Sequence, residues 1–161
     1  MTLASATFER PVFFDDYVEG QVYVFGKTVV SQDEIIEFAR KYDPQSFHID
    51  PELAKSHAYG GLIASGWHSC AMVMRMMTDD FISESASLGS PGVDEIRWKK
   101  PVRPGDTLRV RVEILKTRLS QTKSDRGIVI SQVDVENQDL ETIMSMKTTG
   151  LFLVKDLQQD K

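Results

Sequence analysis

Residues 62–81 read LIASGWHSCAMVMRMMTDDF. Apolar side chains fall on nearly all sides of a helix drawn through this segment. A helix with that pattern is surrounded by other structure instead of lying on a surface. The segment therefore predicts a long buried helix that the rest of the chain wraps. Ser65, His68, Ser69 and Arg75 interrupt the apolar run, so it does not predict a membrane span.

The residues that follow this helix predict strands. Within 107–115, apolar Leu108 and Val110 alternate with charged Arg109 and Arg111, which is the period of a strand with one buried face. The same reasoning gives strands at 93–100, 107–115, 127–136 and 141–154, a turn at 101–106, a hairpin loop at 120–126 and a turn at 137–139.

The residues that precede the helix predict one more strand and a short helix. Residues 21–30 are rich in β-branched side chains and suit a strand. Ser31, with Glu34 three residues later, forms a capping box at the start of a helix. Pro44 disfavours the helical conformation at Asp43, so the helix should end there and present this carboxylate in a loop.

These elements predict an α+β domain in which a five-stranded antiparallel sheet curls around the buried helix. A chain of 161 residues has room for one sizeable core. We expect a flexible lead-in at 1–13, a single domain at 14–154 and a tail at 155–161. A further short helical turn should begin at Asp50-Pro51 and run to residue 56.

The composition of the chain argues against some classes of binding partner. The net charge is -5, whereas phosphate binding needs a basic face, so no nucleic-acid partner is expected. The first ten residues lack a basic start followed by an apolar run and do not predict a secretory signal. The single cysteine, Cys70, suits a packed thiol in a reducing compartment, which predicts a cytoplasmic protein. No membrane partner is expected, because the most apolar segment is interrupted by polar residues.

Asp43 and His48 are candidates for an acid/base pair. A carboxylate and an imidazole can hold a water between them and move protons in both directions near neutral pH. A glycine-rich stretch at 59–66 leads into the predicted helix, whose first N–H groups can stabilise negative charge on a carbonyl oxygen. Together these features indicate addition or removal of water beside a thioester or similar carbonyl. Taken alone, the pair is more often a loop cap and a hydrogen-bonded imidazole.

Two other groups of residues have simpler interpretations. The spacing of His48, His57 and His68 fits no zinc motif and no cysteine lies near, so no metal site is predicted. A basic group favours a solvated face, with contact to the phosphates of coenzyme A as the alternative. Its members are Arg97, Lys99, Lys100 and Arg103.

The segment ARKYDPQSFHID at 39–50, followed by Ala54, resembles the hydratase signature of the MaoC-like, R-specific enoyl-CoA hydratases, which have the hotdog fold. The later segment WKKPVRPGD at 98–106 resembles the strand and turn that follow the central helix of that family. The resemblance covers residues 14–154. It implies a five-stranded antiparallel sheet wrapped around a long central helix, in agreement with the order of elements above.

The resemblance also implies an activity. Asp43 and His48 would activate a water for syn addition to a trans-2-enoyl-CoA thioester, giving a 3-hydroxyacyl thioester, and the N–H of Gly66 would stabilise the enolate oxygen. No metal or redox cofactor is required. The family usually has Ser/Thr-Gly where this chain has Lys41-Tyr42, and Asn-Pro where it has Gln45-Ser46. These departures leave the Asp/His pair intact.

Several further residues are expected to contact the acyl-CoA substrate. Cys70, Met74 and Met77 fall on one helix face and either form the floor of an acyl tunnel or belong to the ordinary core. The full expected set is Gln45, Ser65, Trp67, Cys70, Met74 and Met77. Open strand edges and the family's interfacial site predict a homodimer or an assembly of dimers.

Two alternatives to a hydratase remain at this point. A hotdog acyl-CoA thioesterase normally needs a carboxylate on or near the central helix, and residues 62–78 contain none. A non-catalytic acyl-thioester-binding module would result if Gln45-Ser46 disabled the site.

Overall fold

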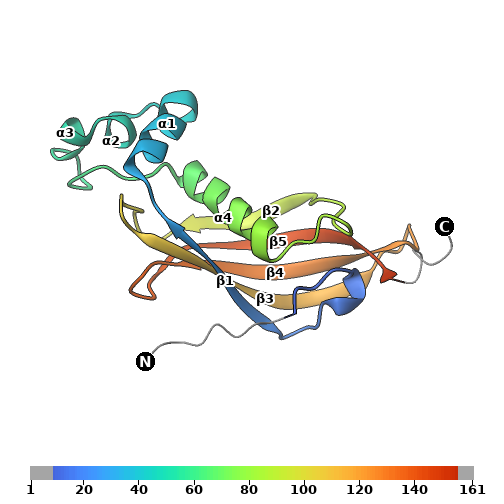
Figure 1. The fold of residues 1–161 in the computed structure, drawn as a ribbon. Helices are drawn as coiled ribbons and strands as arrows, with labels where there is room; N and C mark the ends of the chain where they lie inside the picture. Colours follow the sequence, from blue (N-terminus) through green and yellow to red (C-terminus); the bar gives the residue numbers. More distant parts are fainter. Residues whose placement is uncertain (1–8, 156–161) are drawn as a thin grey trace.

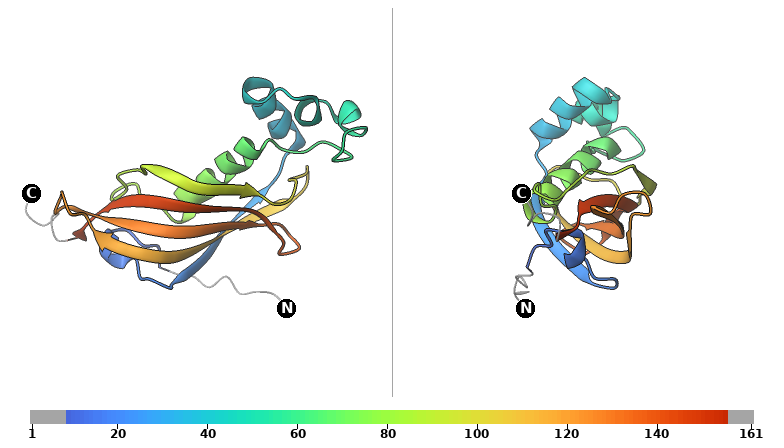
Figure 2. Two further views of the ribbon diagram at one scale, coloured as in Figure 1. Left: turned by 180° about the vertical axis from the view of Figure 1, so that it is seen from behind. Right: turned by 90° about the vertical axis from the view of Figure 1, so that its right-hand side faces the viewer.

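The structure is a computed structural model that describes residues 9–155. One long helix lies against one face of a single sheet, and three short helices gather beyond one end of it (Figure 1). The end-on view in Figure 2 shows the sheet curving around this helix. Residues 1–8 of the expected lead-in and 156–161 of the expected tail lie outside the described residues.

Five antiparallel strands form the sheet, in the order β1-β3-β4-β5-β2. Their bounds are β1 Val22–Val29, β2 Gly92–Trp98, β3 Thr107–Leu119, β4 Arg126–Glu136 and β5 Thr142–Leu153. The predicted α+β fold is confirmed, because alternate residues of β3, among them Leu108 and Val110, are fully buried under the helix while their neighbours face outward. A short 3-10 turn at Phe14–Asp16 precedes β1.

The central helix α4 spans Gly66–Asp80. It begins four residues later than the apolar pattern at 62–81 suggested, at the glycine that the family resemblance placed at the start of the central helix. Residues 62–64 are extended and paired instead: Ile63 N–H donates to Phe47 O, and Ala64 N–H donates to Val102 O. These bonds fix the chain just before the helix, so the apolar character of this stretch reflects burial in a non-helical segment.

The burial of α4 is one-sided, which corrects the expectation of a helix surrounded on all sides. Met72 and Met76 are buried against the sheet, whereas Trp67 and Met74 are 59% and 50% exposed. Gly26 in β1 has a positive φ of 78°, and a Cβ there would lie 2.6 Å from the sulfur of Met76. Glycine therefore permits both the bulge of this strand and the close approach of the helix.

Three short helices precede α4: α1 Gln32–Tyr42, α2 Ser46–Ile49 and α3 Pro51–Ala54. Ser31 caps α1 as predicted, and Asp43 is its C-cap. Asp50 caps α3 by accepting the N–H groups of Glu52 and Leu53. Helix α2 was not predicted, because a single turn between two prolines has no periodicity to detect.

The N-terminal segment contacts the far end of α4. The guanidinium of Arg10 donates hydrogen bonds to the carbonyl oxygens of Thr78, Asp79 and Phe81. A cation there satisfies carbonyls that have no partner within the helix and complements the negative end of its dipole. Within the described part of the chain, no helix has both the length and the apolar character that crossing a membrane requires.

Candidate active site

Asp43 lies at the end of α1 with backbone angles of φ -152° and ψ 67°, outside the helical region. Pro44 prevents the helix from continuing through this position. The side chain is 22% exposed and points toward α2 and the start of α4, because it contacts His48 and Ser65. The predicted presentation of this carboxylate at a helix end is therefore confirmed.

His48 is buried on α2 and held by a backbone contact. Its Nδ1 lies 2.7 Å from the carbonyl oxygen of Ile63, in the extended segment before α4. Since a carbonyl only accepts hydrogen bonds, Nδ1 carries the proton of the neutral ring. Its Nε2 lies 3.3 Å from Asp43 Oδ2. The structure thus brings the two predicted residues together with the Nε2 lone pair directed toward the carboxylate.

Both oxygens of Asp43 accept a hydrogen bond. Gln45 Nε2 donates to Oδ1 at 2.7 Å, and Ser65 Oγ donates to Oδ2 at 2.7 Å. Burial acts to raise the pKa of Asp43, but the hydrogen bonds from Gln45 and Ser65 hold this pKa below its ordinary value, and positive charge on a protonated His48 lowers it further. The carboxylate is therefore ionised at neutral pH.

The N-terminus of α4 adjoins this pair. Ser65 is the N-cap, and its Oγ accepts the N–H of Trp67 at 3.3 Å. No described residue accepts a hydrogen bond from the N–H of Gly66, since the first N–H groups of a helix have no intrahelical partner. Such a group can bind an oxygen that develops negative charge.

Trp98, at the end of β2, packs directly on Gly66. Its indole Nε1 donates to Gly66 O at 3.0 Å. A Cβ at position 66 would lie 2.5 Å from the ring, so any larger residue would force the indole to move. The rings of Trp98 and Trp67 meet edge to face with centroids 5.4 Å apart. Nothing in the sequence indicates that Trp98 belongs to the site, and only the fold reveals this contact.

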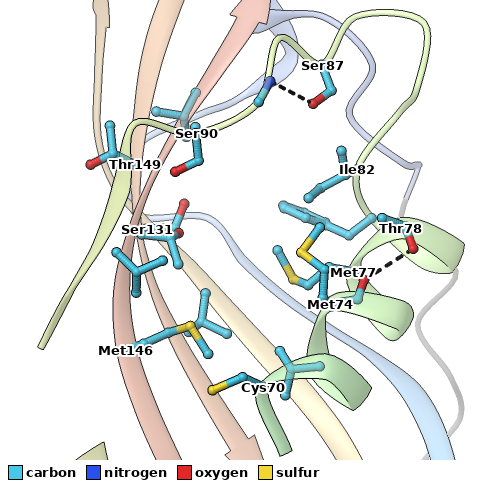
Figure 3. A pocket seen from close by; sticks show the side chains of 18 of the residues that line it. Cys70, Met74, Met77, Thr78, Ile82, Ser87, Ser90, Ser131, Met146 and Thr149 are labelled. Atoms are coloured by element: carbon cyan, nitrogen blue, oxygen red, sulfur yellow. Dashed lines mark hydrogen bonds between the residues drawn. The ribbon is translucent and has the colours of Figure 1, made fainter. Parts of the chain in front are cut away.

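An apolar cavity of about 900 Å³ lies between α4 and the strands β2, β4 and β5. Figure 3 shows Cys70, Met74 and Met77 along its helix wall and Ser131, Met146 and Thr149 along its sheet wall. Trp67 also lines it. Four of the six residues expected to bind substrate therefore share one cavity. Their contact with a substrate stays a prediction.

The Asp43/His48 pair lies beside the cavity and does not line it. Of the described residues, Asp43, His48 and Gly66 do not line the cavity, whereas Trp67 and Cys70, one residue and one helical turn beyond Gly66, do. The route from the pair to the cavity therefore passes the N-terminal turn of α4. Burial raises the pKa of the Cys70 thiol, in keeping with a packed group and not a nucleophile.

The remaining histidines make ring contacts. His57 stacks on Phe47, and His68 stacks on Phe38 with ring centroids 4.8 Å apart. In the part of the chain that the structure describes, no group of three or more His, Cys, Asp or Glu side chains is arranged to hold a metal ion. Of the basic group, Lys100 pairs with Glu141 and Arg103 donates to the carbonyl of Tyr59.

Comparison with known proteins identifies relatives over most of the chain. A family model described as the MaoC like domain matches residues 27–137. The Bacillus subtilis protein YdeM, described as uncharacterized, is 29% identical over 124 residues, which cover 77% of this chain and 86% of YdeM. The 3-hydroxyacyl-thioester dehydratase Z of Mycobacterium tuberculosis is 26% identical over 109 residues, which cover 66% of this chain and 72% of that protein.

A solved structure gives the same picture. The crystal structure of a MaoC-like dehydratase from Rhodospirillum rubrum superposes with a TM-score of 0.83 and 33% sequence identity, covering 90% of this chain and 99% of that one. The resemblance drawn from residues 39–50 and 98–106 is thereby confirmed, and with it the hotdog fold.

Proposed function

The chain belongs to the MaoC-like domain family, and we propose that it is a hydratase or dehydratase that interconverts trans-2-enoyl and 3-hydroxyacyl thioesters. The carrier is coenzyme A in this proposal, and the product is the R isomer, as the family resemblance implies. The observation that carries the proposal is the 3.3 Å separation of Asp43 Oδ2 and His48 Nε2 beside the first N–H of α4.

The hydrogen-bond pattern of the pair supports a water-binding role. Nδ1–H of His48 donates a hydrogen bond to Ile63 O, so Nε2 of the neutral ring is an acceptor. Asp43 Oδ2 is an acceptor as well, because its carboxyl is ionised. Two acceptors at this separation attract a group that donates two hydrogens, and a water molecule does so while its oxygen lone pair remains directed at a substrate.

In the hydration direction, the water oxygen bonds to C3 of the enoyl thioester while His48 Nε2 takes one of its protons. The C2–C3 double bond supplies the electrons that move to the thioester oxygen, where Gly66 N–H stabilises them. The imidazolium then returns its proton to C2, so the elements of water are added without net loss of a proton. Because one group serves both steps from one side, addition is syn.

Asp43 has an electrostatic part in this scheme. Its lowered pKa makes it a weak base, so it holds the water and stabilises the imidazolium while remaining ionised. The contacts favour His48 over Asp43 as the base. Both carboxylate oxygens of Asp43 already accept hydrogen bonds, from Gln45 and Ser65, whereas the lone pair of His48 Nε2 can accept a proton.

The cavity beside α4 suits the acyl chain. Trp67, Cys70, Met74 and Met77 would contact it, with the thioester at Gly66. We also propose that the protein is a homodimer or an assembly of dimers. Strand β2 pairs only with β5 within the described sheet, and Val93 on this strand, like Trp67 and Met74 nearby on α4, is strongly exposed. A cytoplasmic location, which the single cysteine suggested, stays a prediction.

The test is incubation of the purified protein with a short 2-enoyl-CoA. Loss of the enoyl absorbance without thiol release supports hydration. Release of free thiol instead favours the thioesterase alternative, and binding without either reaction favours the non-catalytic module. The variant His48→Ala controls for contaminating hydratase, because it removes the proposed base.

A further inference from the structure

Ser65 makes contacts that differ from those expected of a substrate-binding residue. Its side chain is fully buried. The hydroxyl donates to Asp43 Oδ2 at 2.7 Å and accepts the N–H of Trp67 at 3.3 Å. We propose that Ser65 is a positioning residue, which acts through Asp43 by tying the carboxylate to the N-terminus of α4. Its effect on rate rests on the proposed function, whereas its effect on Asp43 does not.

The two donors to Asp43 differ in what they can fix. Gln45 lies two residues from Asp43 in the same loop, so its bond moves with the carboxylate. Ser65 lies 22 residues away, on the segment that opens α4. Only the Ser65 bond therefore sets the distance between the carboxylate and the helix N-terminus, where Gly66 presents its N–H.

The oxygen that Ser65 holds is the one that faces His48. Oδ2 receives the serine hydroxyl at 2.7 Å and lies 3.3 Å from Nε2. With one lone pair engaged by Ser65, the carboxylate cannot turn about its last torsion without breaking a charge-assisted hydrogen bond. Its other lone pair then stays directed toward the space shared with the imidazole. The Ser65 hydroxyl thus links the Asp43/His48 pair to the N-terminus of α4, where Gly66 presents its N–H.

The charge environment of Asp43 makes this bond measurable. His48 on α2 is the titratable group that faces the carboxylate, and the other contacts, from Gln45 in the loop and Ser65 before α4, come from neutral side chains. Arg40 and Lys41 occupy the last turn of α1. A donor to the charged form of a carboxyl lowers its pKa, so removal of Ser65 Oγ raises it.

The experiment follows the Asp43 carboxyl carbon by NMR during a pH titration of the full chain, in the wild type and in Ser65→Ala. We expect the pKa of Asp43 to be higher in the variant, because the charged carboxylate loses the hydrogen bond from Ser65 Oγ. Turnover with a 2-enoyl-CoA should fall roughly tenfold to a hundredfold, mainly in kcat, with KM little changed.

The matched control is Ser31→Ala. Ser31 caps α1 through Glu34 N–H at 3.4 Å, so this variant loses the same kind of cap and makes no contact with Asp43. Both variants should be less stable by similar amounts, but only Ser65→Ala should shift the Asp43 titration. Ser65→Thr, which retains a hydroxyl, should restore it.

Ser65→Gly separates positioning from capping. Glycine is close to serine as an N-cap, whereas alanine is much poorer, so the glycine variant remains folded if alanine does not. An Asp43 titration that is the same in wild type and in folded Ser65→Gly overturns the proposal. If the titration shifts but no variant, nor the wild type, hydrates an enoyl thioester, then the positioning role stands and the proposed function fails.

Discussion

Replacing Asp43 with asparagine tests the proposed mechanism most directly. The imidazolium that forms on His48 lies 3.3 Å from the carboxylate. At an effective dielectric constant of about 20, two unit charges at this separation attract by about 5 kcal/mol. Solvent reaches 22% of the Asp43 side chain and the amide retains a dipole, so part of this energy is lost to screening. We expect kcat to fall about a thousandfold.

The same substitution should have a small effect on stability. Asparagine keeps the shape of the side chain, and the hydroxyl of Ser65 can rotate to accept a hydrogen bond from the new amide. Gln45 is exposed and can turn to solvent. We expect the free energy of unfolding to change by about 1 kcal/mol, measured by urea denaturation.

Hydration of a short 2-enoyl-CoA by four proteins gives the result: wild type, Asp43→Asn, His48→Ala and the double variant. Because the two groups would serve one water, the double substitution should reduce the rate little more than the worse single one. A folded Asp43→Asn protein that retains turnover within tenfold of wild type would refute the reasoning. Strictly additive losses would show that the residues act on separate steps.

Four further outcomes are expected. The lowered pKa of Asp43 contributes stability that is complete above about pH 5 and is lost as pH falls through that pKa. The difference in unfolding free energy between wild type and Asp43→Asn should therefore shrink below about pH 4. A difference that does not change with pH would contradict the assignment. Met74→Ala should shift preference toward longer enoyl chains with little loss of stability. Met76→Ala, buried against β1 and outside the cavity, should lose about 2–5 kcal/mol without a shift in chain-length preference. Equal chain-length profiles in both variants would show that Met74 does not contact the acyl chain. Gly66→Ala should lower the free energy of unfolding, because the new methyl group collides with Trp98. In a double-mutant cycle measured by urea denaturation, Trp98→Leu should relieve part of this loss. Strictly additive losses of unfolding free energy would argue against the contact. Light scattering at micromolar concentration should give the mass of a dimer or of an assembly of dimers, and a fully active monomer would contradict that proposal.

Much of the fold was predictable because its signals are local. Alternation in 107–115, the cap at Ser31 and the proline after Asp43 each determine a conformation within a few residues. The apolar pattern alone placed the start of α4 too early, whereas the family resemblance placed it correctly at Gly66. Residues 62–64 are as apolar as the helix, and only their pairing with Phe47 and Val102 makes them extended.

The candidate site was also predictable only where its signals are local in the sequence. Asp43 and His48 are near each other in sequence, so their types and spacing indicated a pair. The parts that hold them came from long-range contacts: the Ile63 carbonyl on His48 and the Ser65 hydroxyl on Asp43. A backbone carbonyl has no signature in a sequence. Ser65 could have been noticed as a serine immediately before a helix-opening glycine, although its partner could not.

The packing of Trp98 on Gly66 has an optical consequence. The chain contains two tryptophans, Trp67 and Trp98, and both adjoin the first residue of α4. Their indoles are in edge-to-face contact, with centroids 5.4 Å apart, so they are close enough for their transitions to couple. The tryptophan emission and the tryptophan contribution to the near-ultraviolet dichroism therefore both originate beside the N-terminus of α4. Tryptophan fluorescence therefore monitors the N-terminus of the central helix without any label.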